Sequence, residues 1–96
     1  MVINNQQNKI LKTLNILYIE DEESIKENVK KTLELFCNNV YDAEDISNAK
    51  KILENKRVDI IISDINLPDI CGIDFIKELR KIDKTIPIII LSAYTD

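Results

Sequence analysis

The sequence contains no histidine, and this absence removes a large set of chemistries. Without an imidazole, no mechanism within this chain can depend on a histidine base or a histidine metal ligand. The two cysteines, Cys37 and Cys71, lie far apart, and neither belongs to a C-x-x-C pair. We therefore expect a buried thiol and a loop thiol, not a disulfide or a zinc site.

Glycine occurs once, at Gly72, and long apolar runs are also missing. Dinucleotide and flavin sites use glycine-rich turns so that the backbone can approach a phosphate, which a single glycine does not provide. The longest apolar stretches have the length of a strand, far short of the roughly 20 residues that cross a bilayer. The N-terminus shows no secretory signal pattern. With cysteines expected to stay reduced, these absences predict a cytoplasmic protein that does not enter a membrane.

The composition that is present indicates one small soluble domain. The 96 residues are 45% hydrophobic and 31% charged, which is typical of a folded globular chain. The formal net charge is −4. Because binding to nucleic acid requires a basic surface, this charge argues against nucleic acid as a partner of the domain.

Apolar patterns along the chain alternate between those of strands and those of amphipathic helices. The expected strands cover 14–21, 40–43, 58–63 and 86–93. The expected helices cover 22–37, 46–56 and 72–83, after an N-terminal arm at 1–13. Alternation of this kind implies right-handed crossovers and a parallel sheet, so we predict the α/β class.

Each expected helix carries an apolar stripe that we predict to face the sheet. The stripe residues are Ile25, Val29, Leu33 and Phe36 in the first helix, Ala49, Ile52 and Leu53 in the second, and Ile73, Ile76 and Leu79 in the third. Asp45 or Ser47 is expected to cap the second helix. Asp59, Asp69 and Asp74 are interpreted as solvated or capping groups.

Polar side chains stand where the expected strands end. Glu20 and Asp21 follow the first strand, Asp64 follows the third and Ser92 follows the fourth. Ligands of open α/β sheets bind at the carboxyl ends of strands, so we expect three carboxylates to converge if the first and third strands are neighbours. Two like charges about 4 Å apart repel by roughly 4 kcal/mol at an effective dielectric near 20. Such a cluster takes up a proton or binds a cation.

An oxygen-only ligand set without histidine favours a hard divalent ion, with Mg²⁺ as the first choice. A carboxylate beside Mg²⁺ can also attack phosphorus and form an acyl phosphate. A simpler interpretation exists for each acid alone, because loops are polar and acids often cap helices. Asp21, for example, could cap the helix that starts near Glu22.

Two segments resemble the receiver domain of two-component response regulators. The run "ILYIEDEES" is similar to the first strand and acidic pair of that family, which implies that Glu20 and Asp21 hold the metal. The run "DIIISDINLPDICG" is similar to the phosphorylation segment, which implies that Asp64 accepts the phosphoryl group. The same resemblance implies that Asn66 lends its backbone carbonyl to Mg²⁺.

A third segment extends the resemblance over roughly residues 14–96. The run "IPIIILSAY" is similar to the fourth strand of the family, with Ser92 as the switching hydroxyl and Ala93 as the small residue after it. In the loop after Asp64, Pro68 is expected to turn the chain and Gly72 to allow the sharp entry into the third helix.

The resemblance implies a flavodoxin-like doubly wound sheet in which a histidine kinase or histidine phosphotransfer protein phosphorylates Asp64 with Mg²⁺. Family members continue into a fourth helix, a fifth strand with a buried lysine, and a fifth helix, none of which has a counterpart in these 96 residues. We therefore expect a receiver domain truncated after its fourth strand, with order 2-1-3-4. Strand four would then be an exposed apolar edge, a site for self-association.

Two other functions remain open on the residues. Haloacid-dehalogenase-like phosphatases also place an aspartate nucleophile after a strand, but they need a second aspartate two residues later, where this chain has Asn66. The second alternative is a receiver-like module that binds partners without being phosphorylated. We expect a signalling domain that at most catalyses its own phosphorylation and dephosphorylation.

Overall fold

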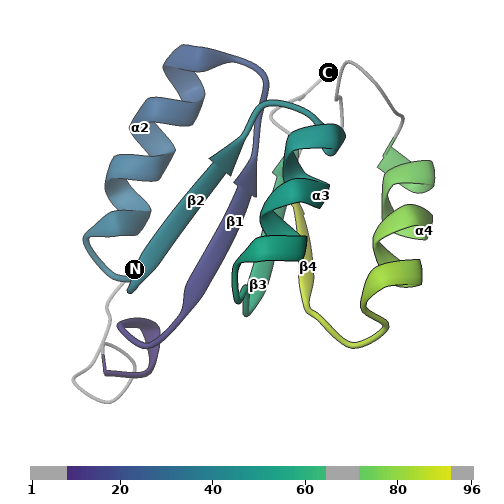
Figure 1. Cartoon of the computed structure of the whole chain (residues 1–96). Coiled ribbons are helices and arrows are strands. Elements are labelled where there is room, and N and C mark those ends of the chain that lie inside the picture. Colours follow the sequence, from purple (N-terminus) through teal and green to yellow (C-terminus); the bar gives the residue numbers. More distant parts are fainter. Residues whose placement is uncertain (1–8, 65–71, 92–96) are drawn as a thin grey trace.

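A computed structural model describes residues 9–64 and 72–91 of the chain. Within these residues strands and helices alternate, as the sequence predicts (Figure 1). The strands are β1 (Asn15–Ile19), β2 (Asn39–Ala43), β3 (Ile60–Asp64) and β4 (Ile88–Leu91). The helices are α2 (Glu23–Glu34), α3 (Ile46–Asn55) and α4 (Gly72–Ile82), and residues 9–11 form a further helical turn. No helix in these two ranges has the length and apolar character needed to cross a membrane.

The four strands form one parallel sheet with the order β2-β1-β3-β4. This confirms the predicted α/β class and strand order. The central strand β1 lies between β2 and β3, so Tyr18 is paired with Asp42 on one side and with Ile62 on the other. The order of strands reverses between β1 and β3, and that reversal marks the expected ligand position of a doubly wound sheet.

One face of the sheet packs against α3 and α4. Successive side chains of a strand point to opposite faces, so Leu17, Ile19 and Ile61 share this side. They are completely buried against Phe75 and Leu79 of α4. We call this side the closed face. Its burial supplies most of the hydrophobic core of the domain.

The other face packs against α2 and is covered less completely. Ile16, Tyr18 and Val40 are buried there, with Val29, Leu33 and Cys37 packed against them. Toward β4 the cover ends, and Ile89 and Leu91 are 47% and 42% exposed. We call this side, which carries Ile16, Tyr18, Ile62 and Ile89, the open face. It holds an apolar hollow of about 210 Å³ lined by Leu11, Leu14, Ile16, Leu33, Phe36, Cys37, Ile60, Ile62 and Ile89.

Several predicted side-chain positions need correction. Ile25 was predicted to face the sheet, but its side chain is 36% exposed. The neighbouring Lys26 is only 9% exposed. Helix α2 also ends at Glu34, before Phe36, although Phe36 still lines the apolar hollow. In α4 both Phe75 and Leu79 are fully buried, and the predicted stripe included Leu79 but omitted Phe75. The side chain of Ile73 lies outside the described part of the chain.

The amino end of the sheet is held by polar contacts that the sequence did not indicate. The Asp59 carboxylate accepts a hydrogen bond from the Asn15 backbone N–H at 2.8 Å, and the Asp59 N–H donates to the Asn15 carbonyl at 2.8 Å. Asp59 is therefore a structural residue that joins β1 to the start of β3. The interpretation of Asp59 as a solvated or capping group was wrong.

Candidate functional site

The structure brings together the acids that end β1 and β3. Carboxylate oxygens of Glu20, Asp21 and Asp64 all lie within 4.8 Å of one another. The register explains why, because Ile19 is paired with Ser63, so Glu20 and Asp64 come next on neighbouring strands. The convergence predicted from the strand ends is therefore present in the structure.

Each acid of this cluster is positioned by a different local feature. Glu20 extends β1 by one residue, since its N–H donates to the Ala43 carbonyl of β2 at 2.9 Å. Asp21 is exposed in the turn before α2. The N-cap of α2 is Glu22, without a capping side-chain hydrogen bond, so Asp21 is not the cap of that helix. Asp64 is the last residue of β3 and is half-buried.

Glu20 is the acid whose environment differs most from water. Its side chain is 4% exposed, and its Oε2 atom is buried without a hydrogen-bond partner among residues 9–64 and 72–91. Burial, followed by a hydrogen bond and the charge of Asp64, raises the pKa of Glu20 to about 7, and the charges of Asp21 and Glu22 act in the same direction. The cluster therefore holds a proton near neutral pH when no cation offsets its charge.

The donor atoms fit a hard divalent cation. All three side chains offer carboxylate oxygens, which are the ligands that Mg²⁺ and Ca²⁺ prefer. A cation at this position would give the buried Glu20 Oε2 the partner that it lacks in the structure. The unsatisfied oxygen and the donor set thus support a metal site independently of one another.

Two further residues contribute to the site and were not identified from the sequence. The fully buried Ser63 donates its hydroxyl to the Asp64 carbonyl at 2.9 Å, which fixes the backbone at the end of β3. Tyr18 precedes Glu20 by two residues on β1 and is 2% exposed. Burial, with the charges of Glu20 and Asp64, raises the pKa of Tyr18 to about 12. The period-two alternation of a strand could have indicated Tyr18, because it shares a face with Glu20.

The remaining predicted site residues lie in other parts of the chain. Helix α4 begins at Gly72, which agrees with the helix start expected there. The predictions for Asn66, Pro68, Ser92 and Ala93 concern positions outside the described residues.

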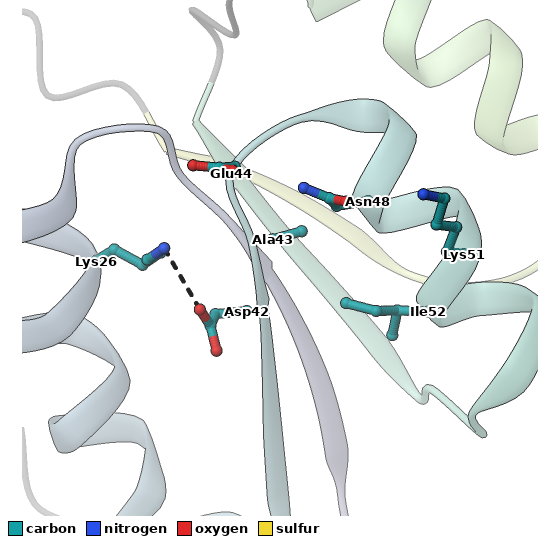
Figure 2. A pocket seen from close by; sticks show the side chains of 7 residues that line it. All are labelled: Lys26, Asp42, Ala43, Glu44, Asn48, Lys51 and Ile52. Atoms are coloured by element: carbon teal, nitrogen blue, oxygen red, sulfur yellow. Dashed lines mark ion pairs between the residues drawn. The ribbon is translucent and has the colours of Figure 1, made fainter.

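A separate polar pocket of about 380 Å³ lies beside β2, between α2 and α3. Figure 2 shows Lys26 of α2 reaching toward Asp42 of β2 at its edge. The Lys26 Nζ lies 3.4 Å from Asp42 and 3.0 Å from Glu23, and the Lys30 Nζ lies 2.7 Å from Asp42. A hydrogen bond from Lys30, with the Lys26 charge, lowers the pKa of Asp42. These contacts attach α2 to β2, and none of them involves the three clustered acids.

A doubly wound parallel sheet with three acids at its carboxyl edge defines a flavodoxin-like domain with an acidic site at the switch in strand order. Comparison with known families makes the class specific. The family model of the response regulator receiver domain matches residues 16–96. The chain therefore belongs to the response regulator receiver family.

Curated relatives of the chain include regulators of transcription. It is 35% identical over 82 residues to the KDP operon transcriptional regulatory protein KdpE of Escherichia coli, covering 85% of this chain and 36% of the relative. It is 37% identical over 78 residues to the alkaline phosphatase synthesis transcriptional regulatory protein PhoP of Bacillus subtilis, covering 81% and 32%. The chain thus spans about a third of the length of these relatives.

Solved structures give the same fold. The chemotaxis response regulator CheY4 of Vibrio cholerae superposes with a TM-score of 0.78 at 32% identity, covering 88% of this chain and 72% of that one. The MaeR response regulator bound to beryllium trifluoride gives 0.77 at 31% identity, covering 88% and 70%. These similarities confirm the receiver fold predicted from the sequence.

Proposed function

We propose that the domain accepts a phosphoryl group on Asp64 from a histidine kinase or a histidine phosphotransfer protein. Glu20, Asp21 and Asp64, with the backbone carbonyl of Asn66, would hold a Mg²⁺ ion beside the acceptor. The observation that carries the proposal is the convergence of three carboxylates within 4.8 Å at the carboxyl edge of the sheet. Membership of the receiver family supports the assignment of Asp64 as the acceptor.

The transfer itself is a displacement at phosphorus. An Asp64 oxygen forms the new P–O bond, the P–N bond to the donor histidine breaks, and its electron pair returns to the imidazole. A Mg²⁺ ion held by these residues would supply positive charge that offsets the charge on the transferring group. Glu20 and Asp21 orient their oxygens toward that position. Ser63 holds the backbone of Asp64 in place through its hydrogen bond to the Asp64 carbonyl.

The phosphorylated state then changes the surface through Ser92 and Ala93. This step, the kinase partner and a cytoplasmic location are parts of the proposal that rest on the family resemblance. The domain functions as a signalling element whose reaction is its own phosphorylation and dephosphorylation.

The proposal is tested with the purified chain, a small phosphodonor such as acetyl phosphate, and Mg²⁺. Intact-mass spectrometry should show the addition of one phosphoryl group, which chelation of the metal prevents. The Asp64→Asn variant should not gain this mass. The matched control is Glu54→Gln, which removes an exposed acid of α3 and should leave the gain intact.

A folded chain that binds Mg²⁺ but gains no phosphoryl group dependent on Asp64 would contradict the proposal. That result would favour the alternative of a receiver-like interaction module. Binding of Mg²⁺ is measured separately by calorimetry, so loss of the metal site is distinguished from loss of the acceptor.

The open edge of β4 supports a second proposal, self-association through this strand. In the described sheet β4 pairs only with β3, and its apolar residues Ile89 and Leu91 remain 47% and 42% exposed. An apolar strand with unpaired backbone groups is a template for pairing with another chain. Sedimentation velocity across a concentration series should show reversible association, and a monomer at every concentration would exclude this mode.

A further inference from the structure

The charged residues of the described chain are sorted between the two ends of the sheet. All four strands are parallel, so their carboxyl ends lie together and their amino ends lie together at the opposite side (Figure 1). At the carboxyl side, the described residues that close or directly follow β1, β2 and β3 include six acids and no base. They are Glu20, Asp21, Glu22, Glu44, Asp45 and Asp64. We call this surface the acidic end.

The opposite end of the sheet carries cations. The described segments that precede the strands hold five bases, all of them exposed: Lys9, Lys12, Lys56, Arg57 and Lys84. We call this surface the basic end. The two acids of the same segments both accept backbone N–H groups, Asp59 from Asn15 at 2.8 Å and Asp83 from Thr85 at 2.8 Å. The basic end is therefore positive, although the chain as a whole has a net charge of −4.

The cations of the basic end are hardly compensated within the chain. Among residues 9–64 and 72–91, the four lysines of this end form no ion pair. Arg57 lies 3.7 Å from Asp59, but its side chain is 86% exposed. Exposed pairs at such a distance contribute little, so this charge also remains available to a partner.

Helix dipoles explain only part of this sorting. The helices run opposite to the strands, so their N-termini favour acids at one end and their C-termini favour bases at the other. Lys56, the C-cap of α3, fits this explanation. Lys9 and Lys12 do not, because they precede β1 and lie at the C-terminus of none of α2, α3 and α4. The basic end thus holds charge that these helices do not require.

We propose that the domain associates head to tail, with the basic end of one copy seated on the acidic end of the next. Each copy presents both complementary surfaces, so a second copy of this chain supplies what each end lacks. A contact between two different surfaces of the same chain is heterologous and can extend to further copies. The seated copy would cover the three clustered carboxylates. This inference goes beyond phosphoryl transfer, and it uses neither face of β4.

The first test is the salt dependence of association, measured by sedimentation velocity of the purified chain with a chelator present. At about 20 mM NaCl the mean sedimentation coefficient should rise with protein concentration. At about 300 mM NaCl the association should be at least about 10-fold weaker, because salt screens exposed charges. Pairing through the apolar β4 strand should not weaken in this way, so salt separates the two modes.

The second test reverses charge at the basic end. Lys56→Glu with Lys84→Glu should abolish the association at low salt. The matched control, Lys51→Glu with Lys77→Glu, produces the same net charge at exposed positions within α3 and α4 and should still associate. Lys56→Gln with Lys84→Gln should give a smaller loss in the same direction, which keeps the test valid if charge reversal impairs folding.

The third test restores the contact by mixing two variants. Glu22→Lys with Glu44→Lys makes the acidic end basic, so this variant alone should not associate. Mixed in equal amounts with the Lys56→Glu, Lys84→Glu variant, it should form complexes, because the two reversed ends are again complementary. Recovery in the mixture also shows that both variants are folded.

A chain that is monomeric at both salt concentrations would overturn the proposal. Association that persists at high salt, or that reversal of the basic end leaves unchanged, would overturn it as well and assign the contact to β4. A monomer that binds a DNA duplex through Lys56 and Lys84 would replace the second copy with another polyanion as the partner of the basic end.

Discussion

The two faces of the sheet are built from the same strands and differ in what covers them. On the closed face, α3 and α4 bury Leu17, Ile19 and Ile61 completely. On the open face, α2 covers β1 and β2, but Ile89 on β4 is 47% exposed. Strand alternation assigns adjacent residues to these different environments. Neighbouring isoleucines of one strand therefore differ sharply in their expected contribution to stability.

The chemistry of the domain lies on the open side. Tyr18 and Glu20 follow Ile16 on one face of β1, and Asp64 follows Ile62 on the same face of β3. By contrast, the polar residue of the closed face at this end is Ser63, whose hydroxyl supports the backbone. We infer that the closed face mainly stabilises the domain and the open face carries its site. The predictions below test that division, beginning with the largest expected effect.

The largest loss of stability is expected from Phe75→Ala on the closed face. Phe75 is completely buried, so its removal leaves a cavity among fully packed neighbours. Substitutions of this kind cost about 3–5 kcal/mol. Urea denaturation measures the change, with Leu35→Ala, which truncates an exposed side chain, as the control. A similar loss in both variants would contradict the assignment of the core to this face.

A second large effect is the pH dependence that Glu20 gives to the metal-free protein. The pKa of Glu20 is about 7 in the folded state and 4.5 for an unperturbed glutamate, so the native state holds more protons between these pH values. The contribution of Glu20 to the free energy of unfolding is fully present below pH about 4.5. It is lost as the pH rises through about 7. The difference corresponds to about 3 kcal/mol.

The measurement is the free energy of unfolding at pH 5 and at pH 8 in the presence of a chelator. Glu20→Gln should remove most of the decrease, whereas the exposed Glu44→Gln should retain it. Saturating Mg²⁺ should also reduce the decrease, because a bound cation stabilises the ionised carboxylate. If the free energy of unfolding changes by the same amount between pH 5 and pH 8 in the wild type and in both variants, the role of Glu20 is refuted.

An intermediate effect is expected where α2 is attached to the open face. Asp42→Asn removes the charge that pairs with Lys26 at 3.4 Å and with Lys30 at 2.7 Å. Lys26 is 9% exposed, so loss of a partner leaves a mostly buried cation with Glu23 alone. We expect a loss of about 1–2 kcal/mol. Glu78→Gln, which breaks the more exposed pairs with Lys50 and Lys81, should destabilise the domain less than Asp42→Asn does.

The sequence predicted the alternation of elements and the convergence of the acids for related physical reasons. Runs of isoleucine and leucine form strands, a βαβ chain makes them parallel, and parallel strands bring their carboxyl ends to one edge. Glu20, Asp21 and Asp64 were therefore recognisable before their separation was measured. Asp45 was likewise one of two predicted caps, and its Oδ1 accepts the Asn48 N–H at 2.8 Å.

Predictions from the sequence were wrong or incomplete where a residue's environment depends on distant parts of the chain. The predicted apolar stripe of the first helix does not include Lys26, because lysine is rarely buried, but carboxylates from α2 and β2 compensate its charge. Phe75 was passed over because isoleucines already completed a plausible stripe on α4. The high pKa of Glu20 required knowledge of its burial and of its contact with Asp64. A linear pattern contains none of these distances.

The smallest expected change in stability comes from Ile89→Lys on the open face. Ile89 is 47% exposed, and a lysine there can keep its charge in water, so the free energy of unfolding should change by less than about 1 kcal/mol. Its neighbour gives the matched control, because Ile88 packs against the core of the closed face. Ile88→Lys buries a charge in that core and should destabilise the domain severely.

Ile89→Lys should also weaken any self-association, since a charge on an apolar edge opposes pairing with another chain. Urea denaturation and sedimentation velocity of both variants measure the two effects. Equal destabilisation by these adjacent substitutions would show that the two faces of β4 are not as different as their exposure indicates.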